Sequence, residues 1–154
     1  MLILVRHGEA NTEGTDANRT LTARGEAAAQ RVAGWAVSAG FTVDEIRHSG
    51  KRRAEQTAET FARALGVADI KGVSGLSPND DPDAMAAVLQ VETARVMLVS
   101  HLPFLSRLVS LLLINDPDRV VVDFRPTTFV ALSRQGTEWT IEAVVHPELI
   151  EDER

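Results

Sequence analysis

The sequence carries, near its start, the stretch Leu2-Ile3-Leu4-Val5-Arg6-His7-Gly8-Glu9. Its four aliphatic residues form a short continuous run, which is typical of a strand that is buried on both faces of a parallel sheet. Gly8 then allows the chain to turn sharply. The predicted strand therefore presents a cation and an imidazole at the carboxyl edge of a sheet, which is the edge where open α/β folds bind ligands.

Composition sets limits on the class of protein. The chain has 154 residues, of which 44% are hydrophobic and 25% are charged, so we expect one domain spanning 1–154. The lack of cysteine excludes a disulfide scaffold, a thiolate zinc site and a cysteine nucleophile. The net charge of −6 argues against a nucleic-acid partner, so an anion site must be built by a few focused arginines.

Hydropathy gives no sign of export or of a membrane partner. The first apolar run covers only residues 1–5, and no basic segment precedes it, so we expect no signal peptide. The later apolar runs fall short of the roughly 20 residues that a membrane span needs. We therefore expect a cytoplasmic location.

Strand and helix patterns alternate along most of the chain. Strands are predicted at 2–5, 41–47, 68–73 and 96–100, and amphipathic helices at about 22–39, 51–65, 82–90 and 103–114. Two further strands, at 128–132 and 140–145, are expected to pair through a turn at 134–136, and an acidic, loosely held tail follows at 148–154. The pattern predicts an α/β fold with three layers: a mostly parallel central sheet with helices on both faces.

Basic residues follow three of the predicted strands. Arg6-His7 comes after the first, Arg52-Arg53 after the second, and His101 after the strand at 96–100. The carboxyl ends of parallel strands share one edge, so we expect these side chains to meet. Arg52 is interpreted as a solvated neighbour of Arg53.

Several of these motifs together resemble the histidine phosphatase superfamily, the phosphoglycerate-mutase-like proteins, and within it the small SixA-type branch of phosphohistidine phosphatases. The resemblance runs from residue 1 to about 144 and is carried by Leu4-Val5-Arg6-His7-Gly8-Glu9, Leu21-Thr22-Ala23-Arg24-Gly25, Ser49, Arg53-Ala54-Glu55-Gln56-Thr57 and Val99-Ser100-His101-Leu102-Pro103. It implies a phosphoglycerate-mutase-like fold and a phosphatase activity.

The resemblance also implies a role for each residue of the site. His7 would attack phosphorus as a neutral imidazole and carry a phosphohistidine intermediate. Arg6 and Arg53 would clamp the phosphoryl oxygens, and His101 would donate a hydrogen bond to them. No metal and no other cofactor is expected, because the arginines supply the positive charge.

The proton donor is less clearly marked. Larger members of the superfamily carry an acidic residue, often Glu, after the third strand, but this chain has no Glu between Thr60 and Val91. Asp80 and Asp81 in that region, and Glu9 beside the nucleophile, are the candidate donors. The missing Glu favours a phosphoramidate substrate, since a leaving imidazole is easily protonated.

Short connections predict a shallow, open site, which suits phosphohistidine on a protein surface better than an enclosed metabolite. Arg19 in the first loop is placed to contact such a partner. Two alternatives stay open: a phosphomonoesterase of the same superfamily that acts on a small metabolite, and a non-catalytic phosphate-binding module. No His-x-x-x-His spacing indicates a metal site, and His48 and His146 are interpreted as structural.

Overall fold

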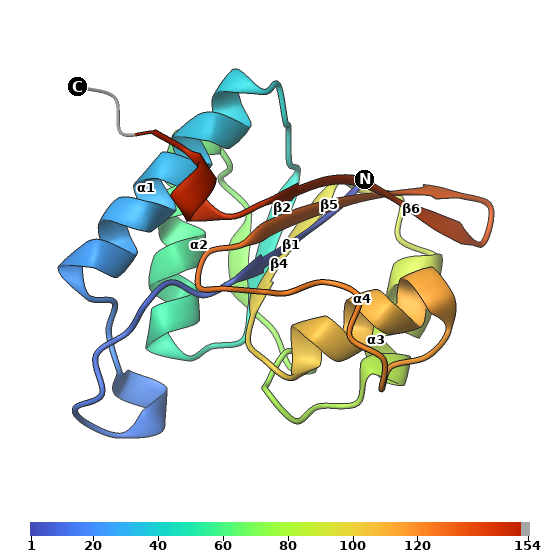
Figure 1. Cartoon of the computed structure of the whole chain (residues 1–154), viewed down its shortest axis with the longest axis horizontal. Helices are drawn as coiled ribbons and strands as arrows, with labels where there is room; N and C mark the ends of the chain where they lie inside the picture. Colours follow the sequence, from blue (N-terminus) through green and yellow to red (C-terminus); the bar gives the residue numbers. More distant parts are fainter. Residues whose placement is uncertain (152–154) are drawn as a thin grey trace.

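A six-stranded sheet lies at the centre of the computed structural model, which describes residues 1–151 (Figure 1). The strands are ordered β3-β2-β4-β1-β5-β6. The first four in this order are parallel to one another, β5 is antiparallel to β1, and β6 is antiparallel to β5. The strands are β1 (Leu2–Arg6), β2 (Glu45–His48), β3 (Ile70–Gly72), β4 (Val96–Ser100), β5 (Phe129–Gln135) and β6 (Glu138–Val145).

Within residues 1–151, four α-helices cover the sheet, and Figure 1 shows α1 and α2 on one side of it and α3 and α4 on the other. They are α1 (Ala23–Ser38), α2 (Arg52–Leu65), α3 (Pro82–Gln90) and α4 (Phe104–Ile114). The prediction of a three-layer, mostly parallel α/β fold is confirmed. Among the helices of residues 1–151, none has the length and apolar character needed to cross a membrane.

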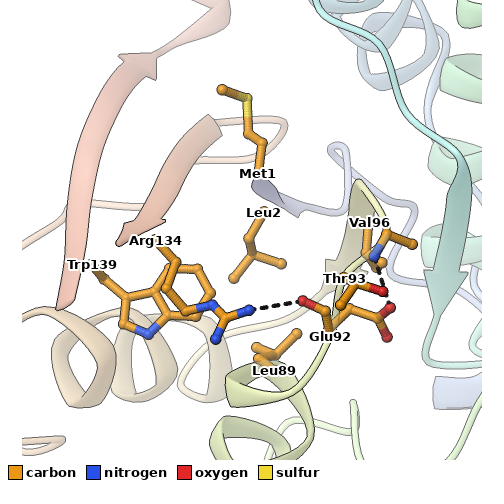
Figure 2. Close-up of a pocket in the computed structure, with 9 residues that line it drawn as sticks. Met1, Leu2, Leu89, Glu92, Thr93, Val96, Arg134 and Trp139 are labelled. Carbon is orange, nitrogen blue, oxygen red and sulfur yellow. Dashed lines mark hydrogen bonds between the residues drawn. The ribbon is translucent and has the colours of Figure 1, made fainter. Parts of the chain in front are cut away.

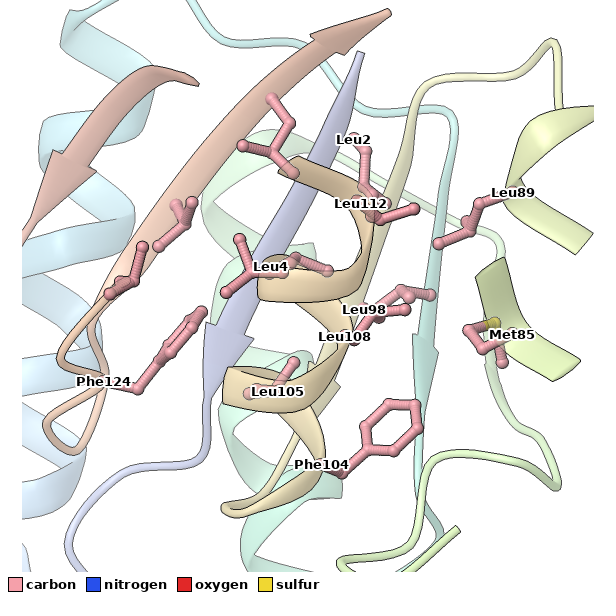
Figure 3. Packing of buried hydrophobic residues seen from close by; sticks show 14 of the residues in the cluster. Leu2, Leu4, Met85, Leu89, Leu98, Phe104, Leu105, Leu108, Leu112 and Phe124 are labelled. Atoms are coloured by element: carbon pink, nitrogen blue, oxygen red, sulfur yellow. The ribbon is translucent and has the colours of Figure 1, made fainter. Parts of the chain in front are cut away.

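The opening strand is buried on both faces, as its sequence predicted. Leu2 and Leu4 belong to the apolar cluster under α3 and α4, and Figure 3 shows them beside leucines of α4. Ile3 and Val5 belong to the cluster under α1 and α2. All four residues are at most 3% exposed, because successive side chains of a strand point to opposite faces and both faces carry helices.

The helix ends carry residues of the types that favour such ends. The Thr22 hydroxyl accepts a hydrogen bond from the Gly25 backbone N–H at 3.0 Å and so caps α1. Gly66 ends α2 in the left-handed conformation, with φ of 68°. Asn115 ends α4 in the same way, with φ of 54°. These residues set where α1 begins and where α2 and α4 end.

Two predicted strands are shorter in the structure. β2 begins at Glu45 rather than at residue 41, because Phe41 packs its ring against Trp35 and Phe129, at centroid distances of 5.6 and 5.1 Å, instead of pairing in the sheet. β3 covers only three residues. Burial therefore accounts for the apolar pattern at 41–43 without a strand.

The carboxyl-terminal hairpin is longer than predicted. Its strands pair as far as Gln135 opposite Glu138, and Gly136 at the turn has φ of 63°. The tail predicted to be loose at 148–154 begins inside a short 3-10 helix, η2 (Pro147–Leu149), and Ile150 packs on the cluster under α1 and α2. The last three residues of that prediction, 152–154, lie outside the described residues.

Gly25 gives a direct test of how the first helix holds the loop after β1. A Cβ at Gly25 would lie 2.1 Å from the backbone oxygen of Glu9, a contact that only a backbone shift can relieve. We expect Gly25→Ala to lower the free energy of unfolding by roughly 1–3 kcal/mol, measured by urea denaturation. Gly34→Ala is the matched control in the same helix. Nothing lies within 4 Å of its added Cβ, so it should stabilise the protein by about 1 kcal/mol. Equal effects of the two substitutions would contradict the packing described here.

Candidate active site

The three basic junctions meet at the carboxyl edge of the parallel strands. They line a pocket of about 340 Å³, and its wall consists of Arg6, His7, Gly8, Glu9, Ala10, Arg19, Arg53, Pro78, His101, Leu102 and Pro126. The rings of His7 and His101 are adjacent, with centroids 4.9 Å apart and planes tilted by 47°. Residues that lie far apart in the sequence therefore line one small pocket.

His7 is held in a defined orientation. Its Nδ1 lies 2.8 Å from the Gly8 carbonyl oxygen, and because a carbonyl can only accept, Nδ1 carries the ring proton. In the neutral ring this leaves Nε2 with a lone pair. The Gly8 N–H donates to the Thr57 hydroxyl at 3.0 Å, and that hydroxyl donates to the Arg53 carbonyl at 2.8 Å. The turn after β1 is thus fastened to the first turns of α2.

The surroundings of His7 keep its ring neutral. Burial, together with the positive charges of Arg53, Arg6 and Arg19, lowers the pKa of His7 to about 4, against the opposing effect of the hydrogen bond to Gly8. At pH 7 the imidazole is therefore uncharged. An uncharged imidazole with a free Nε2 lone pair is able to act as a nucleophile.

His101 is more deeply buried, at 2% exposure. Its Nε2 lies 2.6 Å from the Ser49 hydroxyl oxygen, which also accepts the Lys51 backbone N–H at 3.4 Å. This arrangement favours a hydroxyl hydrogen directed at Nε2 and a proton on Nδ1, the nitrogen that has no partner. Burial, followed by the charges of His7 and Arg53, lowers the pKa of His101 to about 3, so this ring is also neutral at pH 7.

Both arginines have buried N–H groups that lack an acceptor. The Nη1 of Arg6 donates to the Phe124 carbonyl at 2.9 Å, but its Nε has no partner, and the Nε of Arg53 has none either. In the part of the chain that the structure describes, six buried side-chain nitrogen or oxygen atoms lack a partner, and these two and the Nδ1 of His101 are three of them. Buried donors are normally satisfied, so this cluster fits a small oxyanion.

The candidate proton donors are separated in space. Glu9 lines the pocket, where its Oε1 accepts a hydrogen bond from the Thr22 hydroxyl at 3.1 Å. Asp80 accepts the Ser77 backbone N–H at 2.8 Å, and Asp81 caps α3 by accepting the Asp83 N–H at 2.9 Å. The structure brings Glu9 to the site and uses Asp80 and Asp81 to shape the turn that precedes α3.

The first loop supplies one predicted residue and one that sequence reasoning missed. Arg19 lines the pocket and pairs with Asp16 at 3.0 Å. Asp16 also binds Arg53 through its backbone oxygen, at 2.6 Å. Nothing in the sequence distinguishes Asp16 from the other polar residues of this loop, because the contact depends on how the loop folds over α2. Arg52 points elsewhere and pairs with Glu55 and Glu59, which confirms its interpretation as a solvated neighbour.

A second pocket, of about 250 Å³, lies at the opposite edge of the sheet, where β1 and β4 begin (Figure 2). Its arginine, Arg134, donates to the backbone oxygens of Gln90 and Glu92 and lies 5.8 Å above the ring of Trp139. The remainder of its wall is largely apolar and contains no histidine. The chemistry of phosphoryl transfer therefore points to the pocket at the carboxyl edge.

Comparison with known proteins agrees with this geometry. The model of the histidine phosphatase superfamily (branch 1) matches residues 2–77. The phosphohistidine phosphatase SixA of Escherichia coli (strain K12) is 30% identical over 115 residues, which cover 71% of each chain. The structure of the protein histidine phosphatase SixA complexed with tungstate has a TM-score of 0.88 at 25% identity, covering 96% of this chain and 97% of that one.

A more distant structure shares the fold alone. The phosphoserine phosphatase of Entamoeba histolytica, in complex with 3-phosphoglyceric acid, has a TM-score of 0.72 at 19% identity and covers 93% of this chain and 95% of that one. The chain described here belongs to the histidine phosphatase superfamily. It is a phosphatase of the SixA type within that family.

The electrostatics of His7 predict an unusual titration. In an NMR titration, we expect the imidazole of His7 to have a midpoint near pH 4, because burial and three guanidinium groups disfavour its charged form. The unfolded chain binds a proton at this residue near the reference pKa of about 6.5. Between about pH 6.5 and 4, the unfolded state therefore holds more protons, and the free energy of unfolding falls as the pH is lowered.

His7→Asn removes this titrating group and should show a smaller loss of stability between pH 7 and pH 4.5 than the wild type, measured by urea denaturation. A midpoint for His7 near 6.5, or an unchanged pH dependence in the variant, would contradict the environment described above.

Proposed function

We propose that this phosphatase removes phosphate from phosphohistidine on a protein, through a covalent phosphohistidine intermediate on His7 and without a metal ion. The observation that carries the proposal is the arrangement around His7. Its Nδ1 donates to the Gly8 carbonyl, so its Nε2 keeps a lone pair, and Arg6 and Arg53, each with a buried Nε that lacks a partner, line the same pocket.

The first step forms one bond and breaks another at phosphorus. The Nε2 of His7 attacks, and the bond between phosphorus and the nitrogen of the substrate imidazole breaks. The N–H groups of Arg6 and Arg53 donate to the non-bridging oxygens, where charge is held in the transition state. The Nδ1–H of His101 adds a neutral donor. The departing imidazole takes a proton, for which Glu9 is the proposed source, since it is the candidate donor on the pocket wall.

The second step regenerates the enzyme. Water attacks phosphorus, the bond to the Nε2 of His7 breaks, and inorganic phosphate leaves. Glu9, ionised by the first step, accepts the proton of the attacking water, so the enzyme returns to its initial protonation state. The positive charge that the transfer requires comes from the arginines, which accounts for the proposed independence from metal.

The choice of a protein substrate rests on two lines of support. The open site expected from the sequence can receive a side chain that projects from a folded partner. The relatives described as SixA are phosphohistidine or protein histidine phosphatases. We expect the enzyme to work in the cytoplasm, on the sequence evidence given above.

The covalent mechanism is tested by trapping. Rapid quenching in alkaline SDS, which preserves the P–N bond, during turnover of a ³²P-labelled phosphohistidine protein should leave label on the enzyme in the wild type and none in His7→Ala, because the Nε2 lone pair of His7 is available for attack whereas the Nε2 of His101 is bound to Ser49. His146→Ala is the matched control, since this histidine is bound to Thr128 by a 2.7 Å hydrogen bond outside the pocket wall. Full activity of His7→Ala would refute the covalent route, and binding of substrate without turnover by the wild type would indicate a phosphate-binding module.

The substrate class is tested by a comparison of rates. A protein bearing phosphohistidine should be turned over with a kcat/KM at least about tenfold higher than a sugar phosphate, because an imidazole leaving group needs less help from an acid than an alkoxide does. Faster turnover of the sugar phosphate would favour the metabolite phosphomonoesterase instead.

A further inference from the structure

Asp16 lies where three cations meet at the rim of the pocket. Its Oδ1 accepts hydrogen bonds from Arg19 at 3.0 Å and from the Nη2 of Arg53 at 3.2 Å, and its Oδ2 accepts one from the Nζ of Lys51. Its backbone oxygen accepts a further bond from the Nη1 of Arg53 at 2.6 Å. One residue of the short 3-10 helix η1 (Asp16–Asn18) thus holds side chains from two separate parts of the chain.

Asp16 binds only one part of the Arg53 guanidinium. Asp16 engages both terminal nitrogens of the guanidinium, while the Nε remains buried without a partner. The side chain of Arg53 is 4% exposed and that of Asp16 is 58% exposed, so the buried cation is fixed from outside by a carboxylate in contact with water. Because a guanidinium is planar and rigid, fixing its two terminal nitrogens also fixes the direction of its Nε–H. The Nε–H of Arg53 is thereby oriented to donate to an acceptor in the pocket.

Asp16 also changes the balance of charge. Arg53 and Arg19 line the pocket, and Lys51 reaches the same carboxylate, so Asp16 offsets part of the positive charge that attracts phosphate. Hydrogen bonds from Lys51 and Arg19 hold the pKa of Asp16 far below its usual range, so the carboxylate stays ionised over the working pH of the enzyme.

We propose that Asp16 is a positioning residue: its carboxylate aims the Arg53 guanidinium at the phosphoryl group in transfer, and its charge weakens the hold on phosphate enough for the product to leave. This inference rests on the proposed function, since it takes Arg53 to act on the transferred group.

The two roles have opposite effects on binding and rate. Loss of the carboxylate charge makes the pocket more positive, so it binds inorganic phosphate more tightly. Loss of the orientation of Arg53 weakens an interaction needed most in the transition state, so it slows the chemical step. A residue that only supported the fold would lower both the rate and the affinity.

Asp16→Asn separates these effects, because the amide keeps the shape and the backbone contact but not the charge. With an aryl phosphate as substrate, we expect kcat to fall by about tenfold. We expect the inhibition constant of inorganic phosphate to fall by roughly threefold, from the loss of one screened charge at the rim. Asp16→Glu, which keeps the charge, should recover part of kcat and restore the wild-type affinity for phosphate.

Asp44→Asn is the matched control. Asp44 is also an exposed carboxylate paired with an arginine, Arg95, at 2.7 Å, but it lies outside the pocket wall, so its kcat and inhibition constant should equal those of the wild type. An unchanged kcat in Asp16→Asn, or weaker binding of phosphate, would overturn the inference. Failure of the proposed function is seen separately, as an absence of label on His7 in the wild type, which does not involve Asp16.

Discussion

The parallel pairing of β1 with β4 is the constraint on which the site depends. The register sets Arg6 opposite Ser100, so the next residues, His7 and His101, leave the sheet side by side. Neighbouring strands lie about 4.8 Å apart, so this register brings the two residues close together, and their imidazole centroids are 4.9 Å apart. β2 pairs with the other side of β4, and α2, which follows it, brings Arg53 to the same edge.

Burial and charge act in the same direction on the two histidines. Both rings are partly or wholly removed from water, and both have guanidinium groups as neighbours, so the neutral form is favoured in each. Neutral rings differ in what they can do according to which nitrogen holds the proton. The Gly8 carbonyl leaves His7 with a lone pair at Nε2, and Ser49 favours a free N–H at the Nδ1 of His101. Similar residues thus acquire opposite chemical roles from their hydrogen-bond partners.

The loops make a different kind of contribution from the sheet. The sheet fixes His7 and His101 through regular backbone pairing, whereas Arg53 owes its orientation to a residue on an irregular segment. That segment is held mainly by polar contacts, such as the bonds from Asp16 to Arg19 and Lys51. A rigid pair of histidines therefore stands beside an arginine that is oriented by an exposed carboxylate.

The sequence by itself determined the alternating architecture, the helix stops at Gly66 and Asn115, and the set of basic residues that ends up at one edge. These depend on local periodicity, on backbone preference and on strand direction, which neighbouring residues specify. Only the tertiary structure decided that Glu9 lines the pocket while Asp80 and Asp81 do not, that Phe41 packs rather than pairs, and that Asp16 holds Arg53. Such contacts join residues on separately folded elements, so their existence depends on loop paths and side-chain packing in three dimensions, which local patterns do not encode.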